Sequence, residues 1–266
     1  MTAINPTKLK IQSAELGDTF HDIPGFISGM HDLLTFYSDR VRQPDLSKTS
    51  LSLKTYQVPA PVLRALELEL STFLETEPGQ GLKLIDALWQ EEWLEFRQLA
   101  INLLGYIPTS MSRKVLDRIH FWISKSTSEE LNRQIMSKAV AGLITEKPSQ
   151  VLDLLKTLSS TSDRADQQAA VFGLMQFAHY PEFEDLPKIY QILKDILIID
   201  ETGLTKDISA LIQLLQKKSD QETAYFLVRQ MAFASKPRIY KIIRQVLPNF
   251  SEASQQILRD NLESYS

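Results

Sequence analysis

Two groups of carboxylates stand close enough along the chain to suggest catalysis by a carboxylate pair. Asp163 and Asp166 are three residues apart, and Glu91, Glu92 and Glu95 form the second group. Each group also has a simpler interpretation. The macrodipole of a helix favours acids in the first turn, which would account for Asp163 and Asp166. The three glutamates fit a solvated helix face, so neither group by itself predicts a reaction.

Other catalytic chemistries lack the residues that they need. The chain has no cysteine, which excludes thiolate zinc sites, iron–sulfur clusters, disulfides and cysteine nucleophiles. Its four histidines lie far apart, and the sequence has no Walker loop, no dinucleotide-binding glycine motif and no Gly-x-Ser-x-Gly elbow. We therefore expect neither a metal ion nor a cofactor.

A basic stretch near the C-terminus is the clearest sign of binding. No acid occurs between Thr223 and Ser251, although the whole chain carries a net charge of −4 and eight acids fall within 61–100. Five phosphate contacts would give a log–log salt slope of about −4.5, or roughly 500-fold in affinity between 50 and 200 mM salt. The alternative is an ordinary solvated helix edge. The candidate DNA-binding residues are Arg229, Lys236, Arg238, Lys241 and Arg244, of which the last three are spaced to share one edge of a helix over 237–247.

The elements that must position these residues are helices. Apolar residues recur at three- and four-residue intervals in nearly every segment after residue 24, and glycine supplies only 9 of 266 residues. Stop signals such as Gly105 with Pro108, Pro148 and Pro237 divide this pattern. Helices are predicted over 62–70, 82–88, 91–105, 110–124, 128–144, 148–158, 164–178, 183–198, 205–217, 220–233, 237–247 and 252–264.

A small residue followed by an apolar run recurs inside alternate helices. It begins at Ala100, Ala139, Ala170 and Ser209, at intervals of 39, 31 and 39 residues. This is the spacing of HEAT-type helix pairs, which bury their apolar faces by stacking on their neighbours. The expected fold is therefore all-α, a right-handed superhelix of HEAT-like antiparallel helix pairs with one concave face. A non-repetitive helix bundle is the alternative.

The chain's ends and its location follow from simpler observations. Residues 1–23 are expected to form a loosely ordered leader, and 24–266 a single HEAT-like domain. Residues 1–20 contain no apolar signal region, and no stretch approaches 18 consecutive apolar residues, so we expect no association with a membrane. The absence of cysteine fits a reducing cytoplasm.

Several short motifs resemble those of a known family in their order and interval. The segment Lys54–Arg64, KTYQVPAPVLR, is similar to a "GV-x-x-P-x-x-R" entry into a first full repeat, with Gln57 in place of the glycine. Leu88-Trp89 and the run from Glu95 to Ala100 are similar to the "LW" and "E-x-R-x-x-A" motifs that follow. In these motifs, over about 30–264, the chain resembles the HEAT-like alkylpurine DNA glycosylases of the DNA alkylation repair family.

The resemblance implies a concave, basic cleft that holds duplex DNA by its backbone. It also implies hydrolytic release of purines alkylated at N3 or N7, with the damaged base left stacked in the duplex. Because such a base is already a good leaving group, the protein mainly has to stabilise the oxocarbenium sugar. In this family, a carboxylate and aromatic faces provide that stabilisation.

The positions that carry this chemistry in the family are substituted here. The register places Arg133 at the catalytic aspartate and Glu129 at a tryptophan one turn earlier. Gln168 falls at a cleft arginine and Ala210 at a second aromatic residue. A carboxylate facing the developing cation is worth roughly 3–4 kcal/mol, or two to three decades in rate, whereas an arginine repels that cation. A shift of one turn in register would make Asp166 the fallback carboxylate.

Two functions remain open from the sequence. The first is a DNA-binding member of the alkylation repair family, with N-glycosylase activity that is weak, altered or lost. The second is a non-enzymatic scaffold with a protein partner, on the same fold. The basic stretch favours DNA, while the acidic segment 61–100 and the substituted catalytic positions favour the scaffold.

Overall fold

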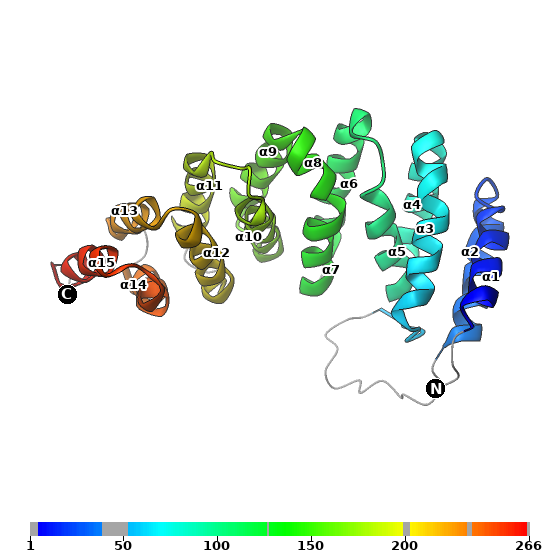
Figure 1. The fold of residues 1–266 in the computed structure, drawn as a ribbon, viewed down its shortest axis with the longest axis horizontal. Coiled ribbons are helices and arrows are strands. Elements are labelled where there is room, and N and C mark those ends of the chain that lie inside the picture. Colours follow the sequence, from blue (N-terminus) through cyan, green and yellow to red (C-terminus); the bar gives the residue numbers. More distant parts are fainter. Residues whose placement is uncertain (1–4, 39–52, 127, 199–202, 233–235, 265–266) are drawn as a thin grey trace. The chain divides into compact units, whose positions relative to one another are not determined.

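The computed structural model describes residues 5–38, 53–126, 128–198, 203–232 and 236–264. These residues form α-helices, short 3-10 turns and one isolated bridge between Lys54 and Trp93, which confirms the all-α class (Figure 1). Contacts divide the chain into two units, Met1–Ile119 with Lys138–Glu146 (unit 1) and His120–Ser137 with Lys147–Ser266 (unit 2). The division falls within α6 (Ser112–Lys125). The single domain expected over 24–266 and the superhelical path stay predictions.

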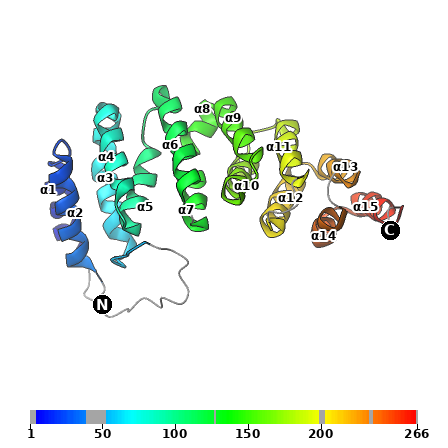
Figure 2. The same cartoon turned by 180° about the vertical axis from the view of Figure 1, so that it is seen from behind.

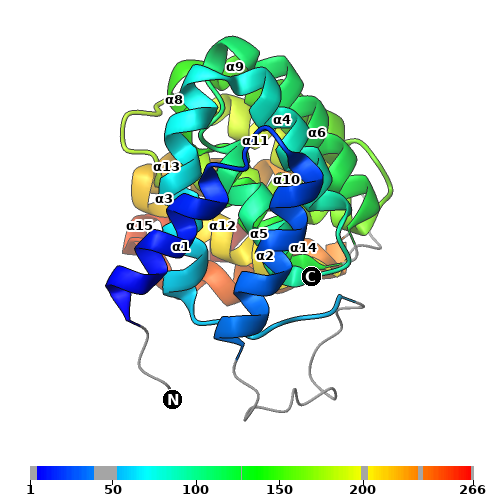
Figure 3. The ribbon, with the colours of Figure 1, turned by 90° about the vertical axis from the view of Figure 1, so that its right-hand side faces the viewer.

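In unit 1 the helices stack in two rows. One row runs from α1 to α3 to α5, and the other pairs α2 with α4 (Figure 3). Helix α3 shows how the sequence produces this packing, because Val62, Leu66, Leu70 and Leu74 recur every four residues and are all fully buried. The helices of this unit are α1 (Pro6–Gly17), α2 (Ile23–Tyr37), α3 (Ala60–Thr76), α4 (Pro78–Gln90), α5 (Leu94–Leu104) and α8 (Ala141–Glu146).

In unit 2 the same alternation is more regular. Row one consists of α7, α10, α12 and α14, and row two of α9, α11, α13 and α15, with each helix packing on the next in its row (Figures 1 and 2). The helices are α7 (Glu129–Gln134), α9 (Pro148–Ser159), α10 (Arg164–His179), α11 (Leu186–Ile198), α12 (Thr205–Lys218), α13 (Asp220–Met231), α14 (Lys236–Val246) and α15 (Glu252–Ser264).

The small residues singled out in the sequence lie inside these stacks. Ala100, Ala139, Ala170 and Ser209 are all buried. The Ser209 hydroxyl donates across row one to Gln245 Oε1 of α14, at 3.1 Å. A small side chain at these positions allows neighbouring helices to approach closely.

The N-terminal segment differs from its prediction. Residues Pro6–Gly17 form α1, whose buried Leu9 and Leu16 lie on a helix that packs against α3. Asn5 caps this helix by accepting from the backbone N–H groups of Thr7 and Lys8, at 3.0 and 3.2 Å. The loosely ordered leader expected over 1–23 is therefore wrong for residues 5–23. The apolar stripe of α1 is so sparse that its periodicity gave little sign of a helix.

The helix predicted over 128–144 is interrupted by a π-helical segment, Ile135–Ala139. Buried pairs recur there every four residues, a stripe that rotates by about 40° per step on an α-helix of 3.6 residues per turn. A wider π turn takes up part of this rotation and keeps the stripe on the core. The pairs are Leu131–Asn132, Ile135–Met136, Ala139–Val140 and Leu143–Ile144.

Asp220 connects three elements of unit 2. Its carboxylate accepts from Gln216 Nε2 of α12 at 2.7 Å, and from the Ser251 backbone N–H and hydroxyl, just before α15, at 3.1 and 2.6 Å. Burial raises the pKa of Asp220, but hydrogen bonds from Ser251, Ser254 and Gln216 outweigh this effect and lower the pKa to about 2. The ionised form is thus the one that unit 2 stabilises.

Asp220→Asn is expected to remove an acid-sensitive part of the stability of unit 2. Because the folded pKa lies below the ordinary value of about 3.9, the stabilisation is complete above about pH 4 and is lost as the pH falls toward 2. We expect a loss of about 1–2 kcal/mol at pH 7, less than for a fully buried carboxylate. Urea unfolding followed by circular dichroism at pH 2–7 measures this. Equal pH dependence in both proteins would contradict the assignment.

Candidate nucleic-acid interface

The basic edge expected on α14 is only partly present. Lys241 and Arg244 are exposed, but Arg238 is 8% exposed and its Nη1 donates to the backbone carbonyl of Ile196 in α11, at 3.2 Å. Residues three apart on a helix drift by about 60° per step, so two steps turn Arg238 away from Arg244 and toward row two. The prediction that Arg238 lies on the exposed edge is therefore wrong.

The other two candidates lie elsewhere. Arg229 is exposed on α13, which belongs to row two, whereas α14 belongs to row one. Lys236 begins α14, and its side chain lies outside the described part of the chain. Lys241 and Arg244 are thus the exposed pair that row one presents on this helix.

Arg133 is the centre of a second group on row one, which we call the Arg133 cluster (Arg133, Phe172, Asp207, Gln168 and Glu129). From α7, its guanidinium lies over the Phe172 ring of α10, with Cζ 4.0 Å from the ring centroid. Its Nη2 is 3.3 Å from Glu129 Oε1 on the same helix and 3.8 Å from Asp207 Oδ1 of α12. One arginine thus contacts α10 and α12 from α7.

Gln168 joins the cluster through the same aspartate. Its Nε2 donates to Asp207 Oδ2 at 2.9 Å, and the Asp207 side chain is 16% exposed. Arg133 and Gln168, two of the positions that the register predicts to be substituted, therefore meet at Asp207. Ala210 is exposed one turn further along α12, where its methyl group presents no aromatic face.

Asp207 and Phe172 were not among the residues predicted from the sequence, although the sequence contains a signal for each. Asp207 follows Gln168 by 39 residues, the interval that also separates Ala170 from Ser209. Phe172 follows Gln168 by four residues and so lies on the same stripe of α10. Aligning successive repeats at that interval would have brought these residues together.

Asp166, the fallback carboxylate, lies outside the cluster. It precedes Gln168 by two residues, about 200° around α10. It is 7% exposed, and its Oδ1 accepts no hydrogen bond from the described residues. Burial, with a smaller contribution from Asp163, raises its pKa. Asp163 caps α10 by accepting from the backbone N–H groups of Ala165 and Asp166, at 2.7 and 3.1 Å, as first-turn acids do.

The glutamates of unit 1 are not a single solvated face. Glu95 is 4% exposed, and its Oε1 accepts from the Thr55 hydroxyl and the backbone N–H groups of Tyr56 and Gln57, at 2.7, 2.9 and 2.8 Å. Glu92 is exposed and pairs with Lys54 at 3.1 Å. The solvated-face interpretation is wrong for Glu95, because the segment before α3 folds back over it.

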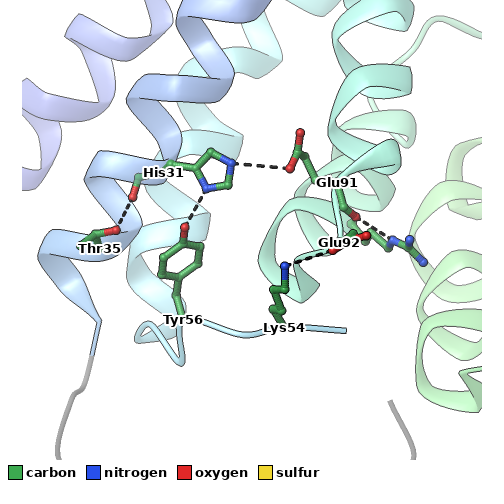
Figure 4. Close-up of polar contacts among 7 residues, drawn as sticks. His31, Thr35, Lys54, Tyr56, Glu91 and Glu92 are labelled. Carbon is green, nitrogen blue, oxygen red and sulfur yellow. Dashed lines mark hydrogen bonds and ion pairs between the residues drawn. The ribbon is translucent and has the colours of Figure 1, made fainter. Parts of the chain in front are cut away.

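His31 fastens α2 to this segment (Figure 4). Its Nδ1 lies 2.7 Å from the Tyr56 hydroxyl, and its Nε2 lies 3.5 Å from Glu91 Oε2. Tyr56 also stacks on Trp93, with ring centroids 3.9 Å apart, and burial raises the pKa of its phenol. These contacts hold elements of unit 1 together.

The helices stack in rows, and the Arg133 cluster joins three helices of row one. The protein is therefore an all-α stacked-helix protein. The family model of the DNA alkylation repair enzymes matches residues 51–240. The chain therefore belongs to this family, which confirms the resemblance and supports a function related to DNA repair. No curated protein and no solved structure matches the chain.

The described residues contain no membrane-spanning helix and no cluster of metal-binding side chains. None of their helices is long and apolar enough to cross a membrane. No three histidine, aspartate or glutamate side chains within the described ranges lie together as a metal-binding group.

Gln57, which the resemblance aligns with a glycine of the family's motif, has a φ of 55°. A left-handed backbone costs a residue other than glycine about 1–2 kcal/mol. Glycine avoids this cost, but it loses more conformational entropy on folding, which reduces the gain by about 0.5–1 kcal/mol. Gln57→Gly should therefore stabilise unit 1 by about 0.5–1 kcal/mol in urea unfolding. The same change at Gln98, inside α5, should destabilise by about 1 kcal/mol. A destabilising Gln57→Gly would contradict the strain.

Proposed function

We propose that the protein binds duplex DNA through row one of unit 2 and does not excise alkylated bases at an ordinary glycosylase rate. Family membership supports DNA as the ligand. The exposed pair Lys241 and Arg244 supplies cations for the phosphate backbone on a stretch without acids. A HEAT-like superhelix would place row one on its concave face, and the absence of cysteine favours a cytoplasmic location.

The proposed loss of excision rests on Arg133, whose guanidinium replaces a carboxylate in the register that the family resemblance implies. A developing oxocarbenium ion needs a negative group beside it, and a guanidinium there raises the barrier. Asp207, the nearest carboxylate from another helix, already accepts from Gln168 and faces Arg133. Its charge is therefore partly neutralised before any substrate arrives.

Internal contacts weaken the scaffold alternative. Several acids of 61–100, which would attract a basic protein partner, are already engaged within unit 1. Glu67 accepts from Asn102 and Tyr106, each at 3.0 Å. Asp86 accepts from Arg118 through both oxygens, at 2.8 and 2.7 Å. With Glu95 buried as well, less of this acidic segment is left for a partner.

Two assays test the proposal. In a gel-shift titration of a 30-base-pair duplex, we expect retardation at 50 mM salt that weakens steeply by 200 mM. No retardation at 50 mM would contradict DNA binding and leave the scaffold. With duplex containing N7-methylguanine, we expect no more free base than in buffer alone. Release that disappears in Asp166→Asn but persists in Arg133→Ala would show that Asp166 is the catalytic carboxylate.

A further inference from the structure

We infer that Arg133 is a phosphate-binding residue, whose ligand is a backbone phosphate of DNA. The inference deepens the proposed function and rests on it. The Arg133 side chain is 44% exposed, and its guanidinium lies over a Phe172 ring that is 1% exposed. Among the described residues, its Nε and Nη1 donate no hydrogen bond. The arginine is thus supported on one face and has donors available.

The acidic neighbours of Arg133 leave its fork unsatisfied. Glu129 is an exposed partner one turn away on the same helix, and such solvent-exposed pairs contribute little to stability. Asp207 lies 3.8 Å from one nitrogen, beyond hydrogen-bond distance. By contrast, Arg118 of unit 1 donates to both oxygens of Asp86 through Nε and Nη2. Arg118 is saturated by its carboxylate, whereas Arg133 is not.

The geometry favours phosphate as the missing partner. A planar guanidinium binds a phosphate through two parallel N–H groups, and stacking on an aromatic ring restricts the side chain before the ligand arrives. Less rotamer entropy is then lost on binding. Glu129 and Asp207 partly neutralise Arg133 in the free protein, and a backbone phosphodiester, with its single negative charge, competes with both for the guanidinium.

A second cation extends the site along α10 and favours a polymer over a single ion. Arg164 is the first residue of α10, exposed, and makes no ion pair with a described residue. With Gln168 and Phe172 it repeats every four residues, so the three lie along one stripe of the helix. Successive phosphates of a DNA strand can follow such a stripe and meet both arginines, whereas an isolated anion would need only one of them.

Fluorescence anisotropy with a labelled 30-base-pair duplex, over 50–200 mM salt, tests the inference. Arg133→Gln should weaken binding by roughly five-fold at 0.15 M salt and reduce the salt slope by about 0.9, the effect of one lost phosphate contact. Arg133→Lys should keep the slope and lose part of the affinity, because an ammonium group cannot form the double contact. Asp207→Asn should raise the affinity several-fold, but not when Arg133 is also replaced.

The matched control is Arg259→Gln on α15 of row two, which changes the net charge equally. If Arg133→Gln and Arg259→Gln behave alike while the wild type binds DNA, Arg133 is not a phosphate contact. If the wild type itself fails to bind, the proposed function fails instead. Circular dichroism melting of each variant verifies that it is folded.

The source of the phosphate is tested by NMR of the Arg133 Nε–H signal, assigned by its loss in Arg133→Lys. Duplex DNA should shift this signal at micromolar concentration. Inorganic phosphate at matched ionic strength should not shift it below millimolar concentration. A response to inorganic phosphate without a response to DNA would overturn the assignment to the DNA backbone.

Discussion

Replacing Lys241 and Arg244 together with glutamine is expected to weaken DNA binding by roughly 30-fold at 0.15 M salt and to reduce the log–log salt slope by about 1.8. Both side chains are exposed on α14, and no acid occurs between Thr223 and Ser251 to neutralise them. Each lost phosphate contact removes one set of released counterions, so the effect should be uniform across DNA sequences.

Anisotropy titrations from 50 to 200 mM salt measure both quantities. The matched control replaces Lys156 of α9 and Arg259 of α15, two exposed cations of row two, and leaves the same net charge. Equal losses in the two double variants would mean that total charge, and not row one, governs binding. Arg238 is left out because its contact with Ile196 is structural. Replacing it would change stability and affinity together.

Glu95→Ala is expected to destabilise unit 1 by about 3 kcal/mol. The change removes one charged acceptor from three donors at once, the Thr55 hydroxyl and the backbone N–H groups of Tyr56 and Gln57. Each unsatisfied group costs about 1–3 kcal/mol, but these donors are half-buried, so water recovers part of the loss. The stacking of Tyr56 on Trp93 depends on the same turn, which is formed by residues 55–57.

Urea unfolding followed by tryptophan fluorescence measures this effect, since Trp89 and Trp93 both lie in unit 1. Glu92→Ala is the control. It removes a glutamate three residues earlier whose exposed pair with Lys54 is worth less than about 1 kcal/mol. If both variants lose the same stability, Glu95 does not hold the turn.

Helices were predictable where burial leaves a trace in the local pattern. The stripe from Val62 to Leu70 and the stop at Gly105 are legible because each depends on residues within a few positions. Helix α1 was missed because it buries few large side chains. The π-helical segment was missed because a four-residue period looks like an ordinary helix until its rotation is followed over several turns.

The candidate site was less predictable, for a different reason. The register aligned Arg133 and Gln168 with positions of one cleft in the family, but their meeting at Asp207 joins three helices far apart in the sequence. Counting charges along the sequence also does not show which side chains point into the protein. Arg238 and Glu95 each stand among other charged residues in the sequence, as surface residues often do. Both are nevertheless buried and bind backbone groups that only the tertiary packing brings to them.

The solvent-facing methyl of Ala210 has a practical consequence. It lies one turn beyond Asp207 on α12, and the natural sequence contains no thiol. Ala210→Cys would therefore create a unique attachment point for a fluorophore one turn from Asp207, without a background of competing labels. The arrival of a ligand at that spot could then be followed directly in real time, independently of any bulk affinity measurement.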